Sequence, residues 1–322
     1  DDVGNLDSTS GRLQLFFTPS DQTSVRFSVD ALDSDNRIYN AEPLSGGNDD
    51  GRSYTQNQDI TIQSAKTERG LSLIAEHEFS SGYTVTSITG WREDETHSIW
   101  ESDESPLDQL VTVTSLEQEQ VSQELRLSSP IGGSFDFVAG LYYFDQTLYQ
   151  PDTFLVGQGW FGIPGILNEQ HDIDVTSYAA FSNFNFHLSD DLTLFLGARY
   201  TDESQDNQTT IQGDPIIVSI FNVQTSVRDK VSISSSDPSW STGIRYQASD
   251  NVMTYGSISR GFKAGGFNTG LRFVGDSRDN FSVGPEFVTS YEIGAKTSWI
   301  ENRLRLNLAA FYLDYTDFQV QT

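Results

Sequence analysis

The stretch DLTLFLGARYTD, residues 191–202, decides the fold of this chain. Apolar side chains occupy alternate positions, namely Leu192, Leu194, Leu196, Ala198 and Tyr200. RLRLNLAAFY, residues 303–312, repeats the pattern, with an apolar residue at every even position. A period of two indicates a β-strand with one apolar face. An apolar face of about five residues is close to what a tilted strand needs to cross a bilayer, so we expect a membrane barrel.

The composition fits such a barrel. Of 322 residues only 36% are hydrophobic, yet 12% are aromatic. A barrel with a polar lumen needs apolar cover on its outer band alone, with aromatic girdles at both interfaces. The longest apolar run, residues 216–221, is interrupted by Ser219 and is too short for a transmembrane helix. We therefore expect one domain over residues 1–322, which is a partial β-barrel.

Charge and motifs exclude several functions. The net charge of −27 opposes nucleic-acid binding, which requires a positive field. The absence of cysteine excludes disulfides and thiol catalysis. The four histidines are scattered without a metal-ligand spacing, and the sequence contains no nucleophile-elbow or Walker pattern. We predict that the chain is not an enzyme and has no catalytic residue, metal site or cofactor.

Twelve strands are expected, and the connections between them alternate between short and long. The expected strands are 10–17, 23–31, 67–79, 82–93, 117–128, 134–148, 172–188, 191–204, 238–247, 251–262, 286–299 and 302–316. The expected long connections are 32–66, 94–116, 149–171, 205–237 and 263–285, with acidic runs such as 93–108. No proline lies inside an expected strand beyond the first residue, which Pro238 occupies in 238–247; this is expected, because proline cannot donate to a ladder. Short turns on one rim and long loops on the other are typical of outer-membrane barrels.

Each alternating strand has a predicted lipid face and a predicted lumen face. Outward sets include Leu13, Leu15 and Phe17; Val25, Phe27 and Val29; Leu71, Leu73 and Ala75; and Tyr291, Ile293, Ala295 and Trp299. The opposite faces carry charged and polar residues, among them Arg26, Asp30, Glu76, Glu124, Asp136, Asn185, Glu292 and Lys296. Strands 82–93 and 251–262 alternate poorly, so no face is assigned to them.

Several stretches resemble the barrel of TonB-dependent outer-membrane receptors. They are VSQELRLSSP (121–130), FVAGLYYFDQ (137–146), SYAAFSNFNFHLSDDLTLFLGARYT (177–201), YGSISRGFKAGGFN (255–268), YEIGAKT (291–297) and RLRLNLAAFYLDYTDFQ (303–319). The resemblance implies a barrel of about 22 strands, short periplasmic turns, long acidic extracellular loops and a plug domain that contacts TonB. Because twelve strands and no plug are found, we expect part of such a barrel, with unpaired edge strands near residues 10–17 and 302–316.

The resemblance also implies a function and partners. It implies TonB-driven uptake of a scarce nutrient across the bacterial outer membrane, with a ferric siderophore as the commonest cargo. Lipid and lipopolysaccharide of the outer membrane are expected partners, together with the TonB complex acting through a plug domain. A passive porin and a surface β-protein such as an adhesin or propeller remain alternatives.

Six residues are candidates for substrate contact. Trp160 and Phe161 lie in a loop rich in glycine and proline, and Trp100 lies in an acidic loop. Exposed aromatic residues often mark binding surfaces. The others, Arg126, Arg199 and Arg245, are expected to face the lumen. Acidic segments at Asp33–Asn36 and Gly46–Gly51 lack the spacing of a calcium-binding EF-hand and are interpreted as solvated loops.

Overall fold

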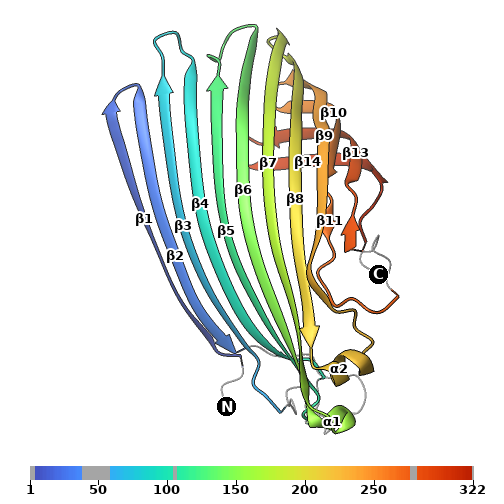
Figure 1. The fold of residues 1–322 in the computed structure, drawn as a ribbon. Coiled ribbons are helices and arrows are strands. Elements are labelled where there is room, and N and C mark those ends of the chain that lie inside the picture. The colour runs from blue at the N-terminus through green and yellow to red at the C-terminus, as the bar shows by residue number, and fades with distance from the viewer. Residues whose placement is uncertain (1–3, 38–58, 104–106, 276–280, 321–322) are drawn as a thin grey trace.

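A computed structural model describes residues 4–37, 59–103, 107–275 and 281–320. They form one strongly curved sheet of twelve antiparallel strands, joined in chain order without crossover (Figure 1). The strands are β1 (Leu6–Ser20), β2 (Thr23–Arg37), β3 (Gln63–Glu78), β4 (Thr84–Glu101), β5 (Leu110–Ser128), β6 (Phe135–Val156), β7 (Gly165–Ser189), β8 (Leu192–Gly213), β9 (Ser226–Ser249), β10 (Val252–Lys263), β13 (Glu286–Trp299) and β14 (Leu304–Thr316). All twelve expected strands are confirmed. The sheet is open, because β1 and β14 are its two ends.

Two short helices and a small hairpin lie among the long connections. The helices are α1 (Gln158–Phe161) and α2 (Pro215–Ile220), and the hairpin pairs β11 (Gly266–Phe267) with β12 (Ser282–Val283). Both helices lie at the same end of the sheet, opposite the tight turns (Figure 1). Neither helix among the described residues has the length and apolar character needed to span a bilayer.

The strands extend much further into the long connections than expected. β4 reaches Glu101, so Asp94, Glu95 and Trp100 belong to a strand and not to an acidic loop. β6 and β9 contain Pro151 and Pro238, which corrects the expectation that no proline lies within a strand. These extensions have little apolar contrast between their faces, so the alternation that marks a bilayer-spanning strand ends before the hydrogen-bonded ladder does.

Strand register confirms the two faces. Directly paired residues share a face of a sheet. Leu13 pairs with Val29, Val29 with Leu71, Leu71 with Trp91, and Trp91 with Val121, which gives an apolar row across five strands. The same pairing fixes β4 and β10, which sequence alone left unassigned: Val85, Thr89 and Trp91 face outward, as do Thr254 and Ile258.

Aromatic residues edge the outward apolar band. Trp91, Tyr143, Tyr178, Tyr200 and Trp240 lie near its boundary on the side of the long connections, and carboxylates such as Glu93, Asp145 and Asp202 follow. The Trp91 Nε1–H donates to Glu119 Oε1 at 2.8 Å, which joins the two layers. This order matches the interfacial girdle of a transmembrane barrel.

Candidate functional site: the inner wall of the sheet

The inner wall carries a cross-strand row that includes two of the candidate arginines. Arg126 on β5, Gly140 on β6, Phe181 on β7 and Arg199 on β8 are successive partners in register. Arg126, Phe181 and Arg199 line a hollow of about 600 Å³, together with Glu124. The glycine is required here, because a Cβ on residue 140 would lie 2.6 Å from a ring carbon of Phe181. The hollow therefore has a cationic side chain on each flank.

The two arginines differ in how they are held. The Arg126 Nε contacts the carboxylate of Glu124 on the same strand. The Arg199 Nε donates to Thr201 Oγ1 at 3.0 Å, and its guanidinium lies 5.3 Å from the Tyr142 ring and 5.9 Å from the Phe181 ring. No described residue forms an ion pair with Arg199. A guanidinium stacked on aromatic rings keeps its charge available for an anion, so Arg199 is the stronger candidate for ligand contact.

Arg245 belongs to a different network, nearer the tight turns. Its Nη2 donates to Asn185 Oδ1 at 2.6 Å, and Asn185 Nδ2 donates to Asp136 Oδ1 at 2.8 Å. The other carboxylate oxygen of Asp136 lies 2.7 Å from His187 Nε2. Phe195 packs under the arginine, with its ring centroid 5.1 Å from the guanidinium. Arg245 thus has polar partners within the wall.

The aromatic candidates lie far from this row. Trp100 pairs with Thr112, which is 14 residues along β5 from Arg126, or about 45 Å at 3.3 Å per residue. Trp160 lies in α1 with its ring centroid 4.9 Å from that of Phe221, and Phe161 is the last residue of the same helix. The six candidates therefore do not form one site: two line the hollow, one joins a separate network, and three lie at the end with the long connections.

A small apolar core brings the chain back onto the inner wall at that end. Val156, Leu167 and Ile211 are inward residues of β6, β7 and β8. Ile217 of α2 and Val223 pack on them, and Leu271 lies against the cluster. The α2 helix and the segment around residue 271 therefore cover part of the wall.

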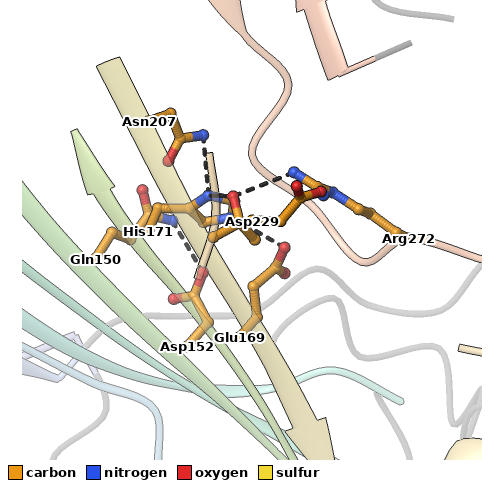
Figure 2. Close-up of polar contacts among 8 residues, drawn as sticks. Gln150, Asp152, Glu169, His171, Asn207, Asp229 and Arg272 are labelled. Carbon is orange, nitrogen blue, oxygen red and sulfur yellow. Dashed lines mark hydrogen bonds and ion pairs between the residues drawn. The ribbon is translucent and has the colours of Figure 1, made fainter. Parts of the chain in front are cut away.

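A buried polar cluster lies on the wall, and sequence analysis missed it. His171 and Thr209 are completely buried, Glu169 and Asn207 are 2% exposed and Arg272 is 3% exposed. Figure 2 shows Glu169, His171, Asn207 and Arg272 converging from β7, β8 and the connection after β10, and Thr209 also belongs to β8. His171 and Arg272 are 101 positions apart in the chain, so only the period-two pattern, continued beyond the expected strand, could have placed His171 on the inner face.

The hydrogen bonds of the cluster form a chain of donors and acceptors from Arg272 to Glu169. Arg272 Nη1 pairs with Asp229 Oδ2 at 3.0 Å, and Arg272 Nη2 donates to Thr209 Oγ1 at 3.2 Å. Thr209 Oγ1 lies 3.1 Å from His171 Nδ1, and His171 Nε2 lies 2.9 Å from Glu169 Oε1. Asn207 Nδ2, which can only donate, lies 3.3 Å from the same His171 Nδ1, so Nδ1 is an acceptor. Thr209 therefore donates to Nδ1, and the proton on Nε2 is donated to Glu169. Arg272, whose guanidinium lies 3.7 Å from the Phe281 ring, thus fastens its connection to the wall.

Acidic residues gather where β4 ends. Glu101 is 1% exposed, and its Oε1 accepts a hydrogen bond from the Asp103 backbone N–H at 3.2 Å. Burial, followed by the nearby charge of Asp103, raises the pKa of Glu101 to about 7. Burial and Asp103 also raise the pKa of Asp59. This end of the sheet therefore carries a carboxyl group that titrates near neutral pH.

The described residues contain no cluster of histidine and acidic side chains with the geometry of a metal site. Asp33–Asn36, interpreted from sequence as part of a loop, lies within β2. The other acidic segment, Gly46–Gly51, lies outside the described residues.

Comparison with known proteins identifies relatives of this sheet. A family model described as TonB dependent receptor-like, beta-barrel matches residues 6–322. The ferric yersiniabactin uptake receptor FyuA of Yersinia pestis superposes with a TM-score of 0.81 at 19% identity, over 100% of this chain and 47% of that one. The siderophore receptor PiuA of Acinetobacter baumannii superposes with a TM-score of 0.72 at 14% sequence identity. The match covers 95% of this chain and 49% of PiuA. The copper transporter OprC superposes with a TM-score of 0.70 at 11% sequence identity. The match covers 98% of this chain and 46% of OprC. This chain spans about half the length of each.

Proposed function

Because the chain belongs to the TonB-dependent receptor β-barrel family, we propose that it forms part of the wall of a transporter that takes up a scarce nutrient with energy from TonB. The family is one of the Gram-negative outer membrane, not of enzymes. The observation that supports the proposal most strongly is the division of the sheet into an apolar outward band and a polar inner wall. A transporter barrel needs both faces.

An iron–siderophore complex is the proposed cargo. FyuA is named as a ferric yersiniabactin uptake receptor and PiuA as a siderophore receptor, whereas OprC is named as a copper transporter, so the shared fold leaves the cargo open. The hollow beside Arg199 and Tyr142 favours an anionic ligand with aromatic or planar groups, which stacks on rings and pairs with a guanidinium.

Uptake by the full-length receptor tests both levels of the proposal. Cells that carry it as their only receptor for a given ferric siderophore would be supplied with radioactive iron on that chelate, with TonB present or deleted. The proposal predicts accumulation that requires TonB. Accumulation that is equal without TonB would indicate a passive porin and contradict the proposal. TonB-dependent uptake of another nutrient, with no response to ferric chelates, would contradict only the cargo.

The remaining proposed partners act on opposite faces of the sheet. A plug domain that contacts the TonB complex would lie against the inner wall, where Asp136, Asn185 and Arg245 present polar groups near the tight turns. Outer-membrane lipid would cover the outward band, and lipopolysaccharide would meet the carboxylates above it. Like charges face each other there, as at Glu93 and Glu119, so divalent cations would favour that contact.

A further inference from the structure

A glycine makes a notch in the outward band at β10. Gly256 on β10 lies between Ile244 on β9 and Ile293 on β13 in register, with Ile258, Tyr291 and Tyr312 in the next row. Together with their neighbours these residues line a groove of about 700 Å³. A Cβ on residue 256 would meet only an Ile293 methyl at 3.8 Å and a backbone oxygen at 3.9 Å. Packing within the protein therefore does not require a glycine at position 256, because a larger side chain would fit.

The groove lies in the outer half of the band. On β14 the outward row runs from Leu304 to Tyr312, counted from the tight turn, and the groove meets this row at Ala310 and Tyr312. The next row out contains Trp240, Arg260 and Thr289, followed by Asp314 on β14. Polar side chains thus begin one row above the groove. An acyl chain in it would come from the outer leaflet.

A cation stands at the mouth of the groove. Arg260 is exposed, faces outward opposite Trp240, and lies over the Phe287 ring at 4.9 Å. No described carboxylate forms an ion pair with it, although Asp314 shares its row two strands away. Two other outward cations are neutralised: Arg69, just above the apolar band, pairs with Glu93 at 3.3 Å, and Lys230, far along β9 toward the long connections, pairs with Asp206 at 3.1 Å. The carboxylates that follow the outward band, such as Glu93 and Asp202, repel a phosphate group. Arg260 is therefore the position at which a phosphate group is attracted.

We propose that the groove at Gly256 and the guanidinium of Arg260 bind one phosphorylated, acylated lipid of the outer leaflet, the lipid A part of lipopolysaccharide. An acyl chain fills the notch between the isoleucines and buries apolar surface on both molecules. A lipid A phosphate pairs with Arg260, whose planar donors match phosphate oxygens. The inference rests on the outer-membrane location and on the proposed contact with lipopolysaccharide, not on uptake.

Native mass spectrometry of the full-length receptor tests this proposal. The purified receptor would be titrated with lipid A, with dephosphorylated lipid A and with phosphatidylglycerol. We expect Arg260→Gln to weaken lipid A binding about fivefold, the effect of one basic residue at an anionic membrane surface. Gly256→Leu should weaken it by about the same factor, because the added side chain occupies the space meant for an acyl chain. Dephosphorylated lipid A should not distinguish Arg260→Gln from the wild type. Matched controls are Ala139→Leu, an outward small residue outside the groove, and Arg69→Gln, whose charge is already paired.

Two results would overturn the proposal. The first is an affinity for lipid A that is unchanged in both variants. The second is an affinity for phosphatidylglycerol that equals the affinity for lipid A and is the same in Arg260→Gln as in the wild type. Should Gly256→Leu fail to assemble, Arg260→Gln and the dephosphorylated lipid still decide the question. TonB-dependent uptake measured on the same variants separates the two proposals, because lipid binding can be lost while uptake persists, and uptake can fail while lipid binding persists.

Discussion

The ring of Phe181 on β7 lies across Gly140 on β6, so close that a Cβ at residue 140 would meet a ring carbon at 2.6 Å and the Leu125 carbonyl oxygen at 2.7 Å. The same ring supports Arg199 on the next strand. Gly140 thus leaves room for the Phe181 ring, and that ring lines the hollow of the inner wall. Two analogous contacts occur further round the sheet, where Phe195 lies over Gly243 and Tyr255 over Gly294.

Gly140→Ala should destabilise the barrel by about 1–3 kcal/mol, because the added methyl overpacks a site where backbone blocks one side. The measurement is the temperature at which the receptor loses its heat-modifiable band on unboiled gels. Gly11→Ala is the matched control, since a Cβ there meets nothing within 4 Å. Equal loss of stability in both variants would show that the effect comes from removing a glycine and not from the Phe181 contact.

Arg199→Gln should weaken binding of an anionic cargo about tenfold, whereas Arg126→Gln should have a smaller effect, since Glu124 already neutralises Arg126. Cargo affinity measured by fluorescence quenching or uptake kinetics gives the comparison. A larger effect at Arg126 than at Arg199 would refute the ranking of the two arginines.

Arg272→Met should release the connection after β10 from the inner wall. The change removes one partner of an ion pair in which the guanidinium is almost completely buried, and such losses typically cost about 3–5 kcal/mol. Limited proteolysis should then cut near residues 268–275 at a rate well above that of the wild type. Lys230→Met removes an exposed pair and should cost less than about 1 kcal/mol, so its cleavage should be unchanged.

Rising pH should weaken the hydrogen bond between Asp103 and the first residue of β5, Leu110. The pKa of Glu101 is raised in the folded protein to about 7, so the stability that its protonated form contributes is present in acid and is lost as pH rises through about 7. Deprotonation places a second charge beside Asp103, whose Oδ2 accepts from the Leu110 N–H at 2.8 Å. Amide hydrogen exchange at Leu110, corrected for its intrinsic pH dependence, should therefore show less protection at pH 8 than at pH 6.

Glu101→Gln is the matching variant, because an amide does not ionise. We expect its protection at Leu110 to be nearly independent of pH over this range. The same pH dependence in the wild type and the variant would mean that a group other than Glu101 controls the protection of Leu110.

The sequence predicts a strand well where one face of the strand meets lipid and the other meets water, and poorly where both faces meet water. Within the bilayer the two faces of a strand meet lipid and water, so Leu304, Leu306 and Leu308 alternate with polar residues and the strand is visible in the sequence. Beyond the band both faces of β4 meet water, and Glu93, Asp94 and Glu95 show no contrast although they are paired with β3 and β5. Strand ends there are fixed by neighbouring strands, which a local pattern cannot reveal.

The candidate site was predictable in part for the same reason. Arg126 and Arg199 lie on inward positions of alternating strands, and register confirms their facing. The His171 cluster depends on Arg272, which a long connection carries back to the wall. No local periodicity encodes that contact. The notch at Gly256 was missed because its strand alternates poorly, and its facing follows only from the register with β9 and β13.

Single-cysteine scanning of β14 tests most directly that one face of this sheet meets lipid and the other meets water. The chain has no cysteine, so each substitution supplies the only thiol of this region. With the full-length receptor in outer membranes, a charged maleimide should label positions 305, 307, 309 and 311 and should fail at 304, 306, 308 and 310. Ala309 and Phe311 make the test sharp, because they are apolar yet face inward in register with Gly294 and Glu292. Labelling that follows residue polarity, or that is uniform along the strand, would contradict the assignment of faces.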